Sequence, residues 1–62
     1  MIIIKVVYEC NRGQDSFCLK LEEFKKLTLT NIQKLCEEDY RKKYPYESAT
    51  WVRPLYTVDL LV

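Results

Sequence analysis

The sequence predicts a small α+β domain in which one helix packs on one face of an antiparallel sheet, in the order β-β-α-β or β-β-α-β-β. Two observations indicate this class. Residues 2–10, 16–21 and 50–62 have the composition and alternation of strands, and residues 32–44 carry apolar side chains at helical spacing. The chain has 62 residues, of which 48% are apolar and 31% charged. We therefore expect a single small domain, residues 1–62, with marginal stability.

The first two strands are expected to form a hairpin. Residues 2–10 are rich in isoleucine and valine, which favour strands, and the alternation of residues 16–21 predicts the second strand. Residues 11–15 between them form a turn, in which Gly13, the one glycine of the chain, can supply a positive φ. Residues 22–29 fit either a short helix or the end of the strand. We expect a connector whose Phe24 and Leu27 point inward.

The helix is expected to begin after Thr30 and to end at Tyr44. Thr30 is a suitable N-cap, and Gln33 follows three residues later, as in a capping box. An apolar stripe follows at helical spacing: Ile32, Leu35, Cys36, Tyr40 and Tyr44. Pro45 ends the helix, because the residue before a proline disfavours the helical conformation.

The last strand runs through residues 50–62 and contains Pro54. Proline cannot donate a hydrogen bond to a neighbouring strand, so Pro54 indicates an edge, a bulge or a tight turn between two short strands. The second and third strands are joined through the helix, so they run parallel to each other. The first strand is apolar on both faces and fits between them, which gives the spatial order 2-1-3.

The alternation divides the side chains between two faces of the sheet. We expect the helix to cover the face that holds the even-numbered residues of the first strand. The predicted core is Ile4, Val6, Phe17, Leu19, Ile32, Leu35, Cys36, Tyr40, Val58 and Leu60. The same alternation assigns Val52, Tyr56 and Val62 to this face.

The opposite face has no helix to cover it. It is expected to carry five apolar side chains: Ile3, Val7, Trp51, Leu55 and Leu61. Arg53 stands at the border of this surface. Leftover apolar surface indicates a binding partner, either a target protein or a second copy in a two-fold dimer. Trp51 is the best anchor, because large aromatic side chains concentrate binding energy.

The composition argues against catalysis. The chain has no histidine, the commonest general base and metal ligand, and one glycine cannot form a phosphate-binding loop. The three cysteines, Cys10, Cys18 and Cys36, have no C-x-x-C spacing. We expect a protein that is not an enzyme, without a metal, a cofactor or a small-molecule substrate. The cysteines are expected to be free thiols; a Cys10–Cys18 bridge across the hairpin is the alternative.

The charge and the cysteines predict a cytoplasmic protein. The formal net charge is +1, which gives no strong attraction to nucleic acid or to anionic lipid. The first residues lack the pattern of a secretory signal, and no run approaches the roughly 20 apolar residues of a membrane span. We therefore expect no membrane association.

A basic and aromatic segment covers residues 40–46 and continues at residues 51–53. Its candidate contact residues are Arg41, Lys42, Lys43 and Tyr46. Aromatic rings stack on unpaired bases, and basic side chains contact phosphates, so the segment has the composition of a single-strand nucleic-acid site. Two other interpretations stay open. The tyrosines can belong to the buried stripe of the helix, with the basic residues favoured by its C-terminal dipole, or the segment can bind a protein.

In size, and in its lack of catalytic groups, the chain resembles the small inhibitor proteins encoded by bacteriophages and other mobile elements, including the anti-CRISPR and anti-restriction kind. The resemblance involves no motif. It implies a non-catalytic protein that docks on a partner macromolecule and occupies its surface. Many such inhibitors are strongly acidic mimics of DNA, which this chain, with its net charge of +1, is not. The alternative function is a small domain that binds single-stranded nucleic acid through the basic and aromatic segment.

Overall fold

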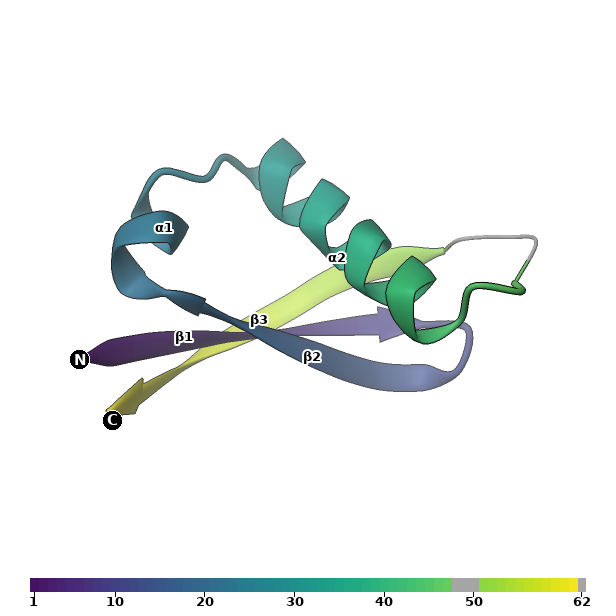
Figure 1. Cartoon of the computed structure of the whole chain (residues 1–62), viewed down its shortest axis with the longest axis horizontal. Helices are drawn as coiled ribbons and strands as arrows, with labels where there is room; N and C mark the ends of the chain where they lie inside the picture. The colour runs from purple at the N-terminus through teal and green to yellow at the C-terminus, as the bar shows by residue number, and fades with distance from the viewer. Residues whose placement is uncertain (48–50, 62) are drawn as a thin grey trace.

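The sheet has three strands and carries both helices on one side. The computed structural model describes residues 1–47 and 51–61. The order along the chain is β1 (Ile2–Cys10), β2 (Gly13–Lys20), α1 (Leu21–Lys25), α2 (Leu29–Lys43) and β3 (Val52–Leu61). The strands form one antiparallel sheet in the spatial order β2-β1-β3, and both helices lie on the same side of it (Figure 1). The predicted fold class, strand order and one-sided helix packing are confirmed.

The β1–β2 hairpin is tighter than predicted. Its register runs from Ile3 opposite Lys20 to Cys10 opposite Gly13, so only residues 11–12 lie outside the ladder. Gly13 has φ +103°, the positive value expected for the glycine. Because Gly13 lets the chain rejoin the ladder at once, residues 14 and 15 belong to β2 and not to the turn.

Residues 22–29 contain the short helix α1 and the start of α2. Phe24 packs against the core, as predicted, and Leu27 is half-buried. The N-cap of α2 is Thr28, so the prediction of Thr30 is wrong. The Thr28 hydroxyl accepts a hydrogen bond from the Asn31 amide at 3.2 Å, and the Asn31 side chain accepts one from the Thr28 amide at 3.3 Å. This capping box begins α2 two residues earlier than predicted, and α2 ends at Lys43, one residue before the predicted Tyr44, which is its C-cap.

β3 is one strand with a bulge, which decides between the alternatives for Pro54. Val7 pairs with Tyr56 but its neighbour Tyr8 pairs with Pro54, so Leu55 is an extra residue in β3. A bulge accommodates a proline, because the ladder is already interrupted there. β3 is also an edge strand of the sheet. Residue 50 and Val62, which the sequence assigned to the strand, lie outside the described residues.

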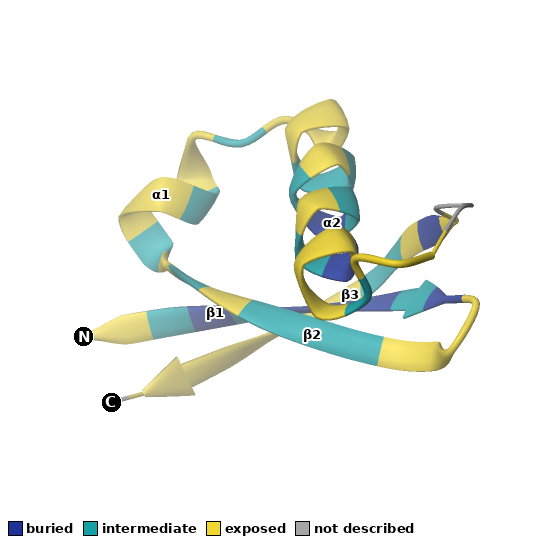
Figure 2. Ribbon diagram, turned by 45° about the vertical axis from the view of Figure 1, so that its right-hand side comes forward, coloured by how far each residue is buried: buried dark blue, intermediate teal, exposed yellow. Residues whose placement is uncertain are grey.

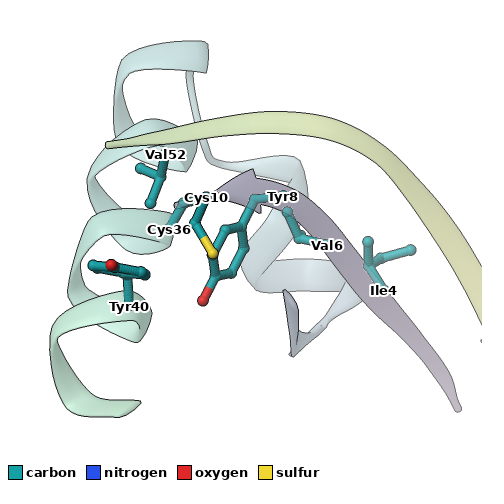
Figure 3. Packing of buried hydrophobic residues seen from close by; sticks show 7 residues of the cluster. All are labelled: Ile4, Val6, Tyr8, Cys10, Cys36, Tyr40 and Val52. Carbon is teal, nitrogen blue, oxygen red and sulfur yellow. The ribbon is translucent and has the colours of Figure 1, made fainter. Parts of the chain in front are cut away.

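The core lies between β1 and α2. The buried cluster is Ile4, Val6, Tyr8, Cys10, Cys36, Tyr40 and Val52. Figure 3 shows the side chains of Tyr8 and Cys10 between the strand and the helix, with those of Cys36 and Tyr40 facing them. The partly buried residues that pack against this cluster are Phe17, Leu19, Leu21, Phe24, Ile32 and Tyr44. The helix therefore covers the even-numbered side chains of β1, as predicted.

Three residues of the predicted core lie outside it. Val58 and Leu60 are exposed, because the bulge turns this half of β3 over: they pair with Lys5 and Ile3, on the face away from the helices. Leu35 is only half-buried and is not part of the core cluster. Tyr8, Cys10 and Val52 occupy the centre of the core instead.

Candidate binding surfaces

The face of the sheet away from the helices, here called the open face, follows from the two registers. Side chains that are directly opposite in an antiparallel ladder share a face. β1 contributes its odd-numbered residues, because its even-numbered ones pack under α2. The rows of the open face across β2, β1 and β3 are Lys20–Ile3–Leu60, Cys18–Lys5–Val58, Ser16–Val7–Tyr56 and Gln14–Glu9–Arg53.

The apolar part of the open face is concentrated on β3. Tyr56, Val58 and Leu60, here called the β3 stripe, are 55%, 38% and 37% exposed. Ile3 of β1 lies opposite Leu60 and is half-buried. A row of apolar side chains on an uncovered sheet face is typical of a contact surface for another molecule.

Three of the predicted contact residues, Ile3, Val7 and Arg53, lie on the open face, but Val7 is inaccessible. Ile3 is half-buried at the end of the β3 stripe. Val7 is only 6% exposed, so its side chain offers little surface to a partner. Arg53 is exposed and forms an ion pair with Glu9 at 3.1 Å.

The remaining predicted contacts do not form one patch with these three. Trp51 precedes β3 and is 48% exposed. Leu55 is half-buried at the bulge, outside the ladder. Leu61 is 86% exposed but pairs with Ile2, so it belongs to the helix side of the sheet. The open face therefore holds the β3 stripe where Leu55 and Leu61 were expected. Strict alternation had assigned the stripe to the core. The signal that could have found it is Pro54, read as a bulge.

The two edges of the sheet differ in protection. At the β2 edge, Lys43 of α2 donates hydrogen bonds to the Ser16 carbonyl at 2.7 Å and to Asp15 at 2.6 Å. At the β3 edge, the bulge and Pro54 interrupt the first half of the strand. The second half, residues 56–61, has no proline or glycine and one charge, Asp59. Within the described part of the chain, side chains 56–61 make no hydrogen bond or ion pair. Native proteins usually protect such edges.

The second half of β3 also lies beyond the cover of α2. Thr57, Asp59 and Leu61 belong to the helix side of the sheet, since they pair with Val6, Ile4 and Ile2, yet all three are exposed. Figure 2 shows this half of β3 as a continuous exposed strand that extends away from the helix. Of the strands in residues 1–47 and 51–61, only β1 pairs with it.

The basic and aromatic segment is divided between core, ion pairs and surface. Tyr40 is fully buried, and Tyr44 is covered by the Arg12 guanidinium, which lies 4.4 Å from the ring centre. Lys43 is held by ion pairs with Asp15 and Asp39 at 2.6 and 2.8 Å. The predicted nucleic-acid contacts that stay open are Arg41, Lys42 and Tyr46, the last 98% exposed.

A polar network joins the hairpin to the end of α2. The Tyr8 hydroxyl donates to Asp39 at 2.6 Å, and the Tyr44 hydroxyl donates to Asp15 at 3.2 Å, with Lys43 between the two carboxylates. Burial raises the pKa of Tyr8, and the hydrogen bond to Asp39 adds to this, so the phenol stays protonated.

The charged members of this network stabilise one another. Burial acts to raise the pKa of Asp15, but hydrogen bonds from Lys43, the Ser16 amide and Tyr44 outweigh it, and the pKa is lowered. Burial likewise acts to lower the pKa of Lys43, but its two carboxylate partners raise it. The network therefore fixes the tip of the hairpin to the helix.

The cysteines are free. Cys10 and Cys36 are buried and Cys18 is exposed. A Cys10–Cys18 bridge does not fit this hairpin, because Cys10 pairs with Gly13 on the helix side and Cys18 pairs with Lys5 on the open face. Burial raises the pKa of the Cys36 thiol to about 11, with Asp39 and Glu37 adding to the shift.

Among residues 1–47 and 51–61, no three side chains of the His, Cys, Asp or Glu type group as a metal site would require.

Comparisons with known proteins give no relative for this chain. No family model matches it, and neither the curated proteins nor the solved structures give a significant match. Among the described residues, no helix has the length and apolarity needed to cross a membrane.

Proposed function

We propose that this chain is a non-catalytic binding protein that docks on a partner protein through the open face of its sheet. The observation that carries the proposal is the β3 stripe, Tyr56, Val58 and Leu60, exposed on a face that neither helix covers. A tyrosine flanked by aliphatic side chains is the kind of surface that concentrates binding energy in protein interfaces.

The charges beside the stripe favour a protein over a nucleic acid as the partner. Lys5 and Lys20 lie beside the apolar part of the open face, and Arg53 is paired with Glu9, so the face has charges of both signs around an apolar stripe. Phosphate binding would require unpaired basic side chains in one patch. On such a face, the docked protein mainly replaces water over apolar side chains.

An inhibitor is the specific role that we propose. The chain has no histidine to act as a general base, so we propose that it acts on its target by covering part of it. The cytoplasm is the compartment that we propose, because an exposed free thiol such as Cys18 suits a reducing environment.

The second candidate function is single-strand nucleic-acid binding through Arg41, Lys42 and Tyr46. All three side chains are exposed at the end of α2 and just beyond it. Lys43, which the sequence included in this site, is already neutralised by two carboxylates. A site with two open cations would bind weakly, and its affinity would fall as salt rises.

One pair of variants separates the two functions: Tyr56→Glu on the open face and Tyr46→Glu on the basic segment. Both tyrosines are exposed, so the substitution adds the same charge and should leave the fold intact. Each immobilised protein is incubated with extract of the source cell, and the retained proteins are identified by mass spectrometry. In parallel, binding of fluorescein-labelled oligo(dT) is followed by anisotropy at low and high salt.

The proposal expects a retained protein that the wild type and Tyr46→Glu share and that Tyr56→Glu loses, with little binding of oligo(dT). The opposite pattern would support the nucleic-acid function: salt-sensitive oligo(dT) binding that Tyr46→Glu removes and Tyr56→Glu keeps. Retention of the same proteins by all three forms would contradict a role for the open face.

A further inference from the structure

We propose that the free edge of β3 pairs antiparallel with the β3 strand of a second copy, about a two-fold axis at Val58. The inference goes beyond the proposed function, because it uses the edge of the sheet and not its open face. The two edges of the sheet differ: Lys43 covers part of the β2 edge, whereas residues 56–61 of β3 have no such cover within the described part of the chain. Tyr56, Thr57 and Val58 are residues that favour strands, and an exposed strand with a free edge is a template for another strand.

The two faces of the sheet restrict the possible registers. A two-fold axis that makes two strands antiparallel keeps the open face of both copies on one side. Opposite residues must then belong to the same face, and residues of one face are an even number of positions apart. The midpoint of each such pair is itself a residue, so the axis passes through a residue and not between two residues. The candidates in the uninterrupted half of β3 are therefore centred on Thr57, Val58 or Asp59.

The positions of Asp59 and Pro54 disfavour two of these three centres. A centre at Asp59 places two carboxylates opposite each other, which is unfavourable. A centre at Thr57 brings Pro54, which cannot donate to a ladder, opposite Leu60. A centre at Val58 avoids both problems and ends the pairing where the bulge begins.

The register centred on Val58 is also complementary in its side chains. On the open face, Val58 meets Val58 of the second copy, and Tyr56 meets Leu60 twice by symmetry. On the helix side, Thr57 meets Asp59 twice, so each hydroxyl can donate to a carboxylate that has no partner among the described residues. The strand is thus complementary to itself in one register.

The result is a continuous six-stranded sheet in the order β2-β1-β3-β3-β1-β2. Its two unprotected edges disappear at the axis, and the two β3 stripes join into one apolar surface on the open face. Dimers with closed two-fold symmetry are the commonest homo-oligomers.

The test exchanges Thr57 and Asp59, which lie off the open face. The molar mass of the full chain is measured by sedimentation equilibrium from low micromolar to near-millimolar concentration. The wild type should pass from monomer to dimer. Thr57→Asp places carboxylates opposite carboxylates at two positions and should raise the dimer dissociation constant about tenfold. The double variant Thr57→Asp with Asp59→Thr restores the complementary pairs and should restore the dimer. Thr30→Asp, the same substitution on exposed α2 surface, is the control.

A crosslinking measurement covers the case in which Thr57→Asp impairs folding. In a Cys18→Ser background, Val58→Cys places two thiols opposite each other on the axis and should give a disulfide-linked dimer on mild oxidation. Leu60→Cys on the same face should not, since the two copies of this residue lie far apart along the strands. A wild type that stays monomeric at near-millimolar concentration would overturn the inference. So would open-ended aggregation, a double variant as weak as Thr57→Asp, or crosslinking at position 60 in place of 58. A wild type that stays monomeric and still captures its target would refute the edge pairing and leave the proposed function intact.

Discussion

Two buried tyrosines offer a sharp test of the core, because one hydroxyl is satisfied and the other is not. Tyr8 and Tyr40 are both fully buried. The Tyr8 hydroxyl donates to Asp39 at 2.6 Å, whereas the Tyr40 hydroxyl has no hydrogen-bond partner among the described residues. The same substitution, tyrosine to phenylalanine, should therefore destabilise the protein at position 8 but not at position 40.

The magnitudes follow from the environment of each hydroxyl. A hydrogen bond to a charged group contributes about 1.5–3 kcal/mol. Asp39 keeps its ion pair with Lys43 after the change, so Tyr8→Phe should cost about 2 kcal/mol. A domain of 62 residues has roughly 3–9 kcal/mol of total stability, so the loss is large. Tyr40→Phe removes an unpaired buried polar group and should be neutral or stabilising by about 1 kcal/mol.

Thermal unfolding followed by circular dichroism measures both effects. For a domain of this size, Tyr8→Phe should lower the melting temperature by about 10 °C. Tyr40→Phe should leave it unchanged or raise it by a few degrees, and denaturant titration should give the same order. A Tyr40→Phe variant that loses as much stability as Tyr8→Phe would refute the reasoning, because it would mean that the Tyr40 hydroxyl is paired in solution.

Three further predictions concern pH, the helix cap and the thiols. Because the pKa of Asp15 lies below its ordinary value of 3.8, its contribution to stability should be complete above pH 3.8 and be lost as pH falls through the lower pKa of the folded state; Asp15→Asn, compared with wild type in acid melting curves, should lack this dependence. Thr28→Ala should cost about 1 kcal/mol in denaturant titration, while Thr30→Ala should cost much less, since Thr28 is the cap. In the native protein, a thiol reagent should modify Cys18 alone, and all three cysteines should react after unfolding without prior reduction, as counted by intact mass. Modification of only one cysteine after unfolding would indicate a disulfide.

The sequence was sufficient to predict the architecture because the elements bury continuous patterns. In β1 all the even-numbered residues are apolar, whereas the odd-numbered ones include Lys5 and Glu9, so the even-numbered side chains could be assigned to the helix side without a structure. The order 2-1-3 followed from the connection through the helix and from the two-sided apolar character of β1. Both inferences depend on local periodicity and on chain connectivity, which a sequence contains.

The second half of β3 could not be predicted in the same way. Pro54 indicated an interruption, but the position of the extra residue depends on how β3 pairs with β1, strands that are distant in the sequence. One extra residue moves every later side chain to the other face. The contact surface was therefore expected at Leu55 and Leu61, whereas the structure presents Tyr56, Val58 and Leu60.

The N-cap of α2 and one ion pair of Lys43 also depend on contacts between residues that are distant in the sequence. Thr28 and Thr30 each have a polar residue three positions later, so the local pattern suits either start. The fold decides between them: Gln33, the partner required by the later start, donates instead to the Val52 carbonyl at 3.0 Å. The ion pair of Lys43 with Asp39 has helical i,i+4 spacing and could have been found, whereas Asp15 reaches Lys43 only through the hairpin.

The bulge also predicts which residue of the sheet can be deleted. Without Leu55, Pro54 and Tyr56 become neighbours in the strand, and neighbours face opposite sides. They already do so, since they pair with Tyr8 on the helix side and Val7 on the open face, so the ladder should close without moving the β3 stripe.

Deletion of Cys18 from β2, which has no bulge, is the control. It makes Phe17 and Leu19 neighbours, and one of these two core-packing side chains must then turn to the open face. Burial alone would predict that deletion of Leu55 costs more stability than deletion of Cys18, because Leu55 is half-buried and Cys18 is exposed. We expect the chain without Leu55 to keep a cooperative melting transition, with a loss of about 1 kcal/mol from its missing side chain. The chain without Cys18 should lose several times as much or fail to fold. If the chain without Cys18 proved the more stable of the two, the register of β3, and with it the position of the β3 stripe, would be wrong.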